Sequence, residues 1–148
     1  MPRIGRVVAF TFTLLLTVLA SSPQPALADQ QKYSGLVYCW SHFSVDKYLS
    51  NNIYTEKQVF NCSEPVEIQI YLTVYVDWTG SFQVYKYHWP YCTVCTEERA
   101  WLDMQNLVGG TYKIEAKAWF RPAYGVKANF PTQTTYITIS GGPSSPAP

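Results

Sequence analysis

Cys92 and Cys95, separated by Thr93 and Val94, have the C-x-x-C spacing of redox-active cysteine pairs. Where such a motif opens a helix, the helix dipole lowers the pKa of one thiol and makes thiol–disulfide exchange possible. Oxidoreductases place the motif in a β-α-β unit, whereas here Pro90 and a strand-like segment precede it and no β-α-β pattern exists. The sequence favours a structural disulfide, and a thiol–disulfide redox protein is the alternative.

The sequence gives weaker support to two other kinds of site, a zinc site and a glycosidase active site. Thiolate and imidazole groups suit a tetrahedral zinc site, and the candidates for one are His88, Cys92 and Cys95 with Cys39 or His42. Export, which the first 28 residues predict, does not favour free thiols, and no second pair has metal spacing. The carboxylates that could serve a glycosidase are Glu97, Glu98 and Asp103. Adjacent residues point in different directions and a small domain offers little cleft, so we expect no catalytic residue, metal or cofactor.

The first 28 residues predict a cleaved secretory signal peptide. Arg3 and Arg6 precede an apolar or threonine run over residues 7–20, which is shorter than the ~20 apolar residues that a membrane span needs. Ala26-Leu27-Ala28 has the small-x-small pattern of a cleavage site. We therefore expect a mature chain that starts at Asp29, a domain over 29–140, a flexible tail over 141–148, and no membrane span after cleavage.

Composition limits the classes of partner. Removal of 28 of the 148 residues leaves 120, the size of one ordinary domain. Without Arg3 and Arg6, the eleven Lys and Arg fall to nine against ten Asp and Glu, with no run of like charge, so nucleic acid is not an expected partner. All four cysteines lie beyond residue 28, and their even number predicts two disulfides with three possible pairings.

Two segments alternate between apolar and polar residues with the period of a half-buried strand. The inward positions of the first are Val66, Ile68, Ile70, Leu72, Val74 and Val76. The turn signal 77–80 predicts a hairpin to the segment 81–89, where Phe82 and Val84 claim one face and Tyr85, Tyr87 and Trp89 the other, so a bulge could satisfy both. The inward positions of the second strand are Tyr112, Ile114, Ala116, Ala118 and Phe120.

Shorter strands are expected over 36–43, 54–62 and 134–140, and a helical turn fits only 96–106. About seven short strands without an amphipathic helix predict an all-β fold, an antiparallel β-sandwich.

The segment 106–116 resembles the corner that opens the penultimate strand of immunoglobulin-like domains, where a tyrosine hydroxyl bonds to the preceding backbone. Tyr112 would be that structural corner. The wider layout resembles small secreted immunoglobulin-like proteins of Gram-positive bacteria, a family without an assigned function. The resemblance implies an immunoglobulin-like sandwich. Because Ile114 stands where antibody domains have their second cysteine, we expect Cys39 to pair with Cys62 and Cys92 with Cys95.

Outward aromatics suggest a binding surface. In an immunoglobulin-like sheet, Trp119 and Tyr136 would lie side by side, next to a loop that contributes Arg121, Tyr124, Lys127 and Phe130. Tyr71 and Tyr75 would form a smaller pair on the other sheet. Contiguous exposed aromatics usually mark a partner site. We therefore expect a secreted, non-catalytic domain that binds a protein or glycan at or outside the bacterial cell envelope. A purely structural envelope component is a further alternative.

Overall fold

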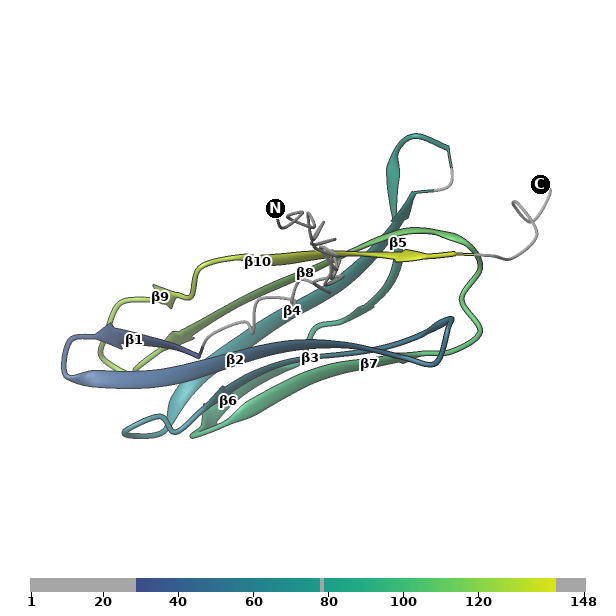
Figure 1. Ribbon diagram of the computed structural model, residues 1–148. Helices are drawn as coiled ribbons and strands as arrows, with labels where there is room; N and C mark the ends of the chain where they lie inside the picture. Colours follow the sequence, from purple (N-terminus) through teal and green to yellow (C-terminus); the bar gives the residue numbers. More distant parts are fainter. Residues whose placement is uncertain (1–28, 78, 141–148) are drawn as a thin grey trace, which may run out of the picture.

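The computed structural model describes residues 29–77 and 79–140, and these form two antiparallel β-sheets without any helix (Figure 1). The smaller sheet has the order β1-β2-β3-β7, and its strands are β1 (Gln30–Ser34), β2 (Val37–Tyr48), β3 (Asn52–Phe60) and β7 (Glu98–Met104). The larger sheet has the order β10-β8-β4-β5, with β6 also paired to β4 and β9 to β8. Its strands are β4 (Val66–Asp77), β5 (Phe82–His88), β6 (Tyr91–Cys95), β8 (Gly110–Arg121), β9 (Ala128–Asn129) and β10 (Gln133–Ile139).

The two sheets lie face to face around one hydrophobic core, so the predicted all-β, antiparallel architecture is confirmed. The described residues form ten strands, whereas about seven were expected. The strands that were not expected are β1 and β7 in the smaller sheet and β6 and β9 in the larger one.

The long strands β4 and β8 form the central ladder of the larger sheet. Eleven residue pairs join them, from Glu67 opposite Arg121 to Asp77 opposite Thr111. Both predicted alternations are confirmed, because every inward side chain of the two strands is at most 3% exposed: Val66, Ile68, Ile70, Leu72, Val74, Val76, Tyr112, Ile114, Ala116, Ala118 and Phe120. The polar phase of each strand consequently covers the outside of the sandwich.

Strand β5 contains the bulge that its ambiguous pattern suggested. Val74 pairs with Lys86 while the next residue, Tyr75, pairs with Val84, so Tyr85 is the extra residue. The Tyr85 ring turns inward, with its centroid 5.8 Å from that of Tyr112. The bulge therefore places Val84 and Tyr87 on the same outer face, although the sequence pattern had assigned them to opposite faces.

The helical turn expected within 96–106 is wrong. Residues 98–104 form β7, which pairs with β3 from Glu98 opposite Val59 to Met104 opposite Ile53. Ala100, Leu102 and Met104 point into the core. Their two-residue period and the open edge of β3 outweigh the modest helix propensities of the segment.

The N-terminal half forms longer strands than expected. β2 and β3 make a hairpin around residues 49–51, where Leu49 has a positive φ of 58°. The predicted disulfide between Cys39 and Cys62 is present and joins β2 to the residues that follow β3. Cys39 is fully buried and Cys62 is 9% exposed. This cross-link closes a long chain segment, which by chain-entropy arguments stabilises the fold by about 3 kcal/mol.

Tyr112 forms the corner that its sequence context suggested. Its side chain is fully buried, and its hydroxyl donates a hydrogen bond of 2.9 Å to the carbonyl oxygen of Val108. Gly110, at φ 154°, lies between the two and lets the chain turn. Burial, together with the nearby Tyr85, raises the pKa of Tyr112 to about 12. The hydroxyl thus remains a donor at any physiological pH.

Lys57 is the unexpected member of the core. It lies on the inward phase of β3, is fully buried, and donates hydrogen bonds to Ser41 Oγ at 3.0 Å and Gln133 Oε1 at 2.6 Å. Its ammonium also lies 5.6 Å from the centroid of the Phe130 ring. Burial lowers the pKa of Lys57 to about 8, and the charge of Asp29 opposes that shift.

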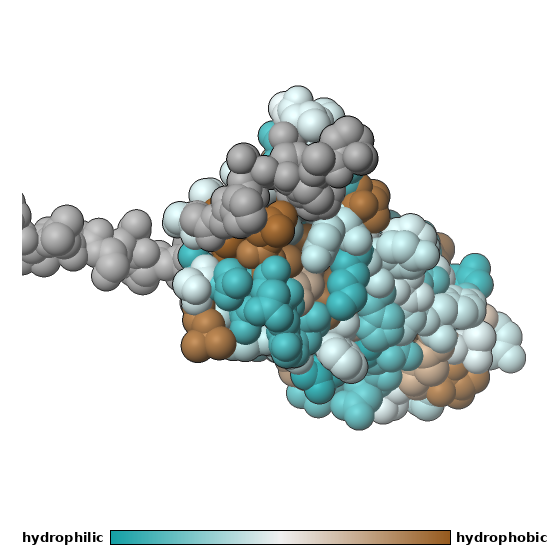
Figure 2. Space-filling view, turned by 90° about the vertical axis from the view of Figure 1, so that its right-hand side faces the viewer, coloured by the Kyte–Doolittle hydropathy of each residue, from teal (hydrophilic) through white to brown (hydrophobic). Residues whose placement is uncertain are grey.

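The predicted signal peptide (residues 1–28) and the predicted tail (residues 141–148) lie outside the described residues. Among the residues that the structure describes, no helix is long and apolar enough to span a bilayer. On the face that Figure 2 shows, hydrophilic and intermediate residues predominate and hydrophobic residues form separate groups.

Replacing Tyr112 with Phe keeps the packing and removes one hydrogen bond, so we expect a loss of about 1 kcal/mol in the free energy of unfolding. Tyr112→Ala should cost about 3 kcal/mol or more, because it also leaves a cavity. Denaturant unfolding measures both, and Tyr136→Phe, at an exposed tyrosine, is the matched control. A Tyr112→Phe midpoint equal to that of the wild type would show that the hydroxyl does not stabilise the corner.

The buried Lys57 predicts a pH dependence of stability. Between its folded pKa of about 8 and its ordinary value of 10.5, the unfolded chain binds the proton more strongly, so stability rises with pH. We expect the free energy of unfolding to increase by roughly 1 to 2 kcal/mol between about pH 7.5 and 9.5. Urea titrations across this range should show a flatter profile for Lys57→Met, and an equally steep one would rule out Lys57 as the cause.

Candidate functional site

The outer face of the larger sheet carries many partly exposed aromatic side chains. It combines the outward phases of β4 and β8 with side chains from β5, β6 and β10. Its most exposed rings are Tyr71 at 37%, Phe82 at 39%, Trp89 at 49%, Tyr91 at 50%, Tyr87 at 58% and Tyr136 at 59%. Apolar surface of this kind is costly when it is contiguous, so this face is the candidate binding surface.

The larger group of rings, which we call the Trp119 cluster, consists of Tyr71, Tyr87, Trp89, Tyr91 and Trp119. Ring centroids are 5.9 Å apart for Tyr71 and Trp89, 4.4 Å for Tyr87 and Trp89, and 6.3 Å for Tyr91 and Trp119. These residues come from the strands β4, β5, β6 and β8 and from the connection between β5 and β6. Only the pairing of β5, β6 and β8 with β4 brings them together.

Trp89 is held by the connection between β5 and β6. The carbonyl oxygen of Pro90 accepts hydrogen bonds from the backbone N–H of Ile70 at 3.1 Å and from Gln69 Nε2 at 2.9 Å. The Trp89 indole N–H donates to Thr73 Oγ1 at 3.1 Å. The ring is therefore fixed on β4 and keeps half of its surface exposed.

A second group, the Lys113 cluster, comprises Tyr75, Phe82, Lys113 and Tyr136. The Lys113 ammonium lies 4.0 Å from the ring centroid of Tyr75 and 5.5 Å from that of Phe82. The Phe82 and Tyr136 centroids are 6.0 Å apart. These contacts occupy the opposite end of the same outer face.

Trp119 and Tyr136 do not lie side by side, which corrects the sequence expectation. Tyr136 pairs with Lys113, whereas Trp119 is six positions further along β8, about 20 Å at the rise of a strand. β10 begins at Gln133, opposite Ala116, and so does not reach Trp119. Tyr71 and Tyr75 were expected on the other sheet, but they lie on β4, next to β8 in the sheet of Trp119.

The four candidates from the loop have different environments. Phe130 is buried, with its ring 5.8 Å from that of Phe120, so it packs in the core and reaches the surface only as part of the lining of a depression. Tyr124 is fully exposed. Arg121 donates to Glu67 at 2.5 Å. Lys127 is exposed, with its ammonium 4.4 Å from the ring centroid of Trp119. Of these four, Lys127 is the exposed residue whose ammonium lies over a ring of the Trp119 cluster.

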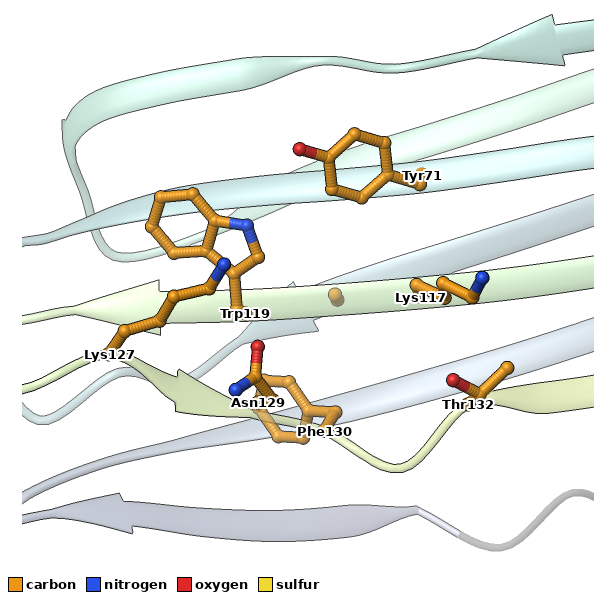
Figure 3. A pocket seen from close by; sticks show the side chains of 8 residues that line it. Tyr71, Lys117, Trp119, Lys127, Asn129, Phe130 and Thr132 are labelled. Atoms are coloured by element: carbon orange, nitrogen blue, oxygen red, sulfur yellow. The ribbon is translucent and has the colours of Figure 1, made fainter.

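A depression of about 290 Å³ lies between Tyr71 and Trp119 (Figure 3). We call it the Trp119 depression, and its lining is Tyr71, Lys117, Ala118, Trp119, Lys127, Asn129, Phe130 and Thr132. The lining includes two ammonium groups, an indole N–H, an amide and two hydroxyls, but no carboxylate. Hydrogen-bond donors therefore predominate in it.

Ion pairs neutralise most charges next to the depression. Glu115 accepts a 2.8 Å contact from Lys117, and Glu67 accepts contacts from Arg121 and the Tyr91 hydroxyl. The Tyr91 hydrogen bond, helped by Arg121, lowers the pKa of Glu67 below its ordinary value. Within 29–77 and 79–140, Lys127 contacts no carboxylate, and it is the uncompensated cation of the lining.

The C-x-x-C pair forms the predicted disulfide on β6, where Cys92 pairs with Ile68 and Cys95 with Val66. No helix N-terminus lies here to lower a thiol pKa, because both cysteines belong to a strand. A carboxylate oxygen of Glu98 lies within 4.8 Å of both sulfur atoms, and its negative charge disfavours a thiolate. Among the described residues, Cys92, Cys95 and Glu98 lie close enough together to be considered as metal ligands. The two sulfur atoms are bonded to each other, so they are not free thiolates that could bind a metal ion.

Tyr87, Trp89 and Tyr91 were not expected among the site residues. The bulge in β5 and the return to β4 after Pro90 decide where they point, and neither can be located from periodicity alone. The one available signal was their density, since five aromatic residues occur between 82 and 91.

Comparison with protein-family models, curated proteins and solved structures gave no match to this chain.

We expect no thiol to be alkylated in the denatured chain without reductant, because both disulfides are formed. Peptide mapping under the same conditions should join Cys39 to Cys62 and Cys92 to Cys95. Alkylation of two cysteines before reduction, or a peptide that joins Cys39 to Cys92 or Cys95, would contradict these pairings.

Proposed function

We propose that this protein is a secreted, non-catalytic binding domain that acts at or outside the cell envelope through the Trp119 cluster. The observation that carries the proposal is the group of contiguous, half-exposed rings on the outer face of β4, β5, β6 and β8. Flat rings with polar neighbours stack on sugar faces, and the same rings can anchor a protein ligand.

An immunoglobulin-like arrangement is the fold that we propose for this sandwich. In immunoglobulin domains the second strand lies next to the strand that precedes the corner, and the corner strand lies between the third and the last strands. If β2 is taken as the first strand, β3 lies next to β7, and β8 lies between β4 and β10. The Tyr112 hydrogen bond at the start of β8 supports the same assignment.

The disulfides support an extracellular location. They use all four cysteines and indicate a non-reducing compartment. The signal-peptide pattern of residues 1–28 agrees with export.

Binding is favoured over redox chemistry because the aromatic cluster has the exposure that a binding surface needs, whereas the β6 disulfide lacks the surroundings of a reactive cysteine pair. The disulfide of β6 lies on a strand next to Glu98, without the electropositive setting that makes cysteines reactive. The aromatic rings, in contrast, stay partly exposed, and that of Trp89 does so although its indole N–H is bonded to Thr73.

The test compares tryptophans of equal exposure on the two sheets. Purified residues 29–148 are applied to a glycan array and to purified Gram-positive cell walls, together with Trp89→Ala and the control Trp101→Ala. Trp89 is 49% exposed in the Trp119 cluster, and Trp101 is 50% exposed on β7. We expect Trp89→Ala to weaken binding about tenfold or more and Trp101→Ala to change it less than twofold.

Unfolding midpoints show that each variant is folded. Equal losses in the two variants, or none in Trp89→Ala, would contradict binding through this cluster.

A further inference from the structure

The Trp119 depression has an electrostatic bias that the aromatic rings alone do not explain. Its lining has no carboxylate, and Lys117 is already paired with Glu115. Lys127 keeps its charge next to the Trp119 ring, and no described carboxylate contacts it. A ligand that enters this depression meets one uncompensated positive charge, which an anionic group would neutralise.

A second observation points to the same place. The indole Nε1 of Trp119 is shielded from solvent and has no hydrogen-bond partner among the described residues. Figure 3 shows this nitrogen on the side of the ring toward Tyr71, where both residues line the depression. A buried donor without a partner is costly, and a ligand oxygen that displaces the side chains now covering this nitrogen would satisfy it.

The surface next to the depression fits the rest of a sugar chain. Tyr71 leads to Trp89 and then to Tyr87, with centroids 5.9 Å and 4.4 Å apart. These rings are between 37% and 58% exposed, and the hydrogen bond from Trp89 to Thr73 holds the middle one. Aromatic faces of this kind pack against the C–H faces of sugar rings, while the depression of about 290 Å³ is near the lower size limit of small-ligand sites.

We infer that the Trp119 depression binds an acidic sugar unit of an extended anionic glycan, with its carboxylate next to Lys127. The neighbouring sugar units stack on Tyr71, Trp89 and Tyr87, and a carboxylate oxygen that displaces the side chains covering Trp119 Nε1 accepts its N–H. This inference rests on the proposed function and specifies the chemistry of the ligand at the same site.

A protein ligand fits the depression less well. Protein anchors that fill pockets are mostly large apolar or aromatic side chains. Such an anchor would bury the Lys127 charge and the Trp119 donor without a partner, which lowers affinity. Acidic sugars supply both the acceptor and the flat apolar faces.

The experiment uses the chain as it is secreted from cells that express the full sequence. It measures binding to polygalacturonate, alginate and hyaluronan, and compares each polysaccharide with its carboxyl-reduced, neutral form. We expect at least one acidic polysaccharide to bind about tenfold more tightly than its neutral form, with affinity that falls as salt rises. Lys127→Gln should remove this preference. Lys113→Gln is the matched control, because it removes an equal charge next to another ring about 20 Å away on the same face.

Three results would overturn the inference. They are equal binding of acidic and neutral forms, equal losses in the Lys127 and Lys113 variants, and binding to poly-glutamate but to none of the polysaccharides. Equal binding of the acidic and neutral forms that Trp89→Ala abolishes would leave the proposed binding function standing and refute the acidic ligand alone. Binding that neither Trp89→Ala nor Lys127→Gln weakens would refute both.

Discussion

The eleven-pair ladder between β4 and β8 is the constraint on which the rest of the structure depends. Successive residues of a strand point to opposite faces, so each pair contributes to both the core and the outer surface. Ile70 and Ala118 bury their side chains between the sheets, while their neighbours Tyr71 and Trp119 line the depression outside. A slip of one residue in this register would bury the site and expose the core.

The corner at Tyr112 and the disulfide at Cys39 secure the two ends of this arrangement. The Tyr112 hydroxyl holds the start of β8 against Val108, which fixes where the alternation of that strand begins. The Cys39–Cys62 bond fixes β2 to the segment that leads into β4. Neither contact touches the aromatic site, but both determine where its strands run.

Some polar side chains have hydrogen-bond or ion-pair partners within the fold, and others do not. Lys57 is buried, yet Ser41 and Gln133 accept its hydrogen bonds, so its ammonium is a structural element of the core. On the outer face, Glu67 and Glu115 neutralise Arg121 and Lys117. In the lining of the Trp119 depression, Lys127 and the Trp119 indole N–H lack an anionic or accepting partner among the described residues. This contrast is the reason to place ligand recognition there.

The two long strands and the presence of two disulfides follow from strict alternation and from the even number of cysteines. The Tyr112 corner and the pairing of the cysteines followed from a resemblance, and the pattern of β5 allowed a bulge without giving its position. Only the tertiary structure decided that residues 98–104 form a strand, that Phe130 is buried, and that Trp119 meets Tyr91 and not Tyr136. These outcomes depend on which strands pair and at what register. Pairing is a long-range choice made by the whole core, and the local pattern of a segment does not encode its partner.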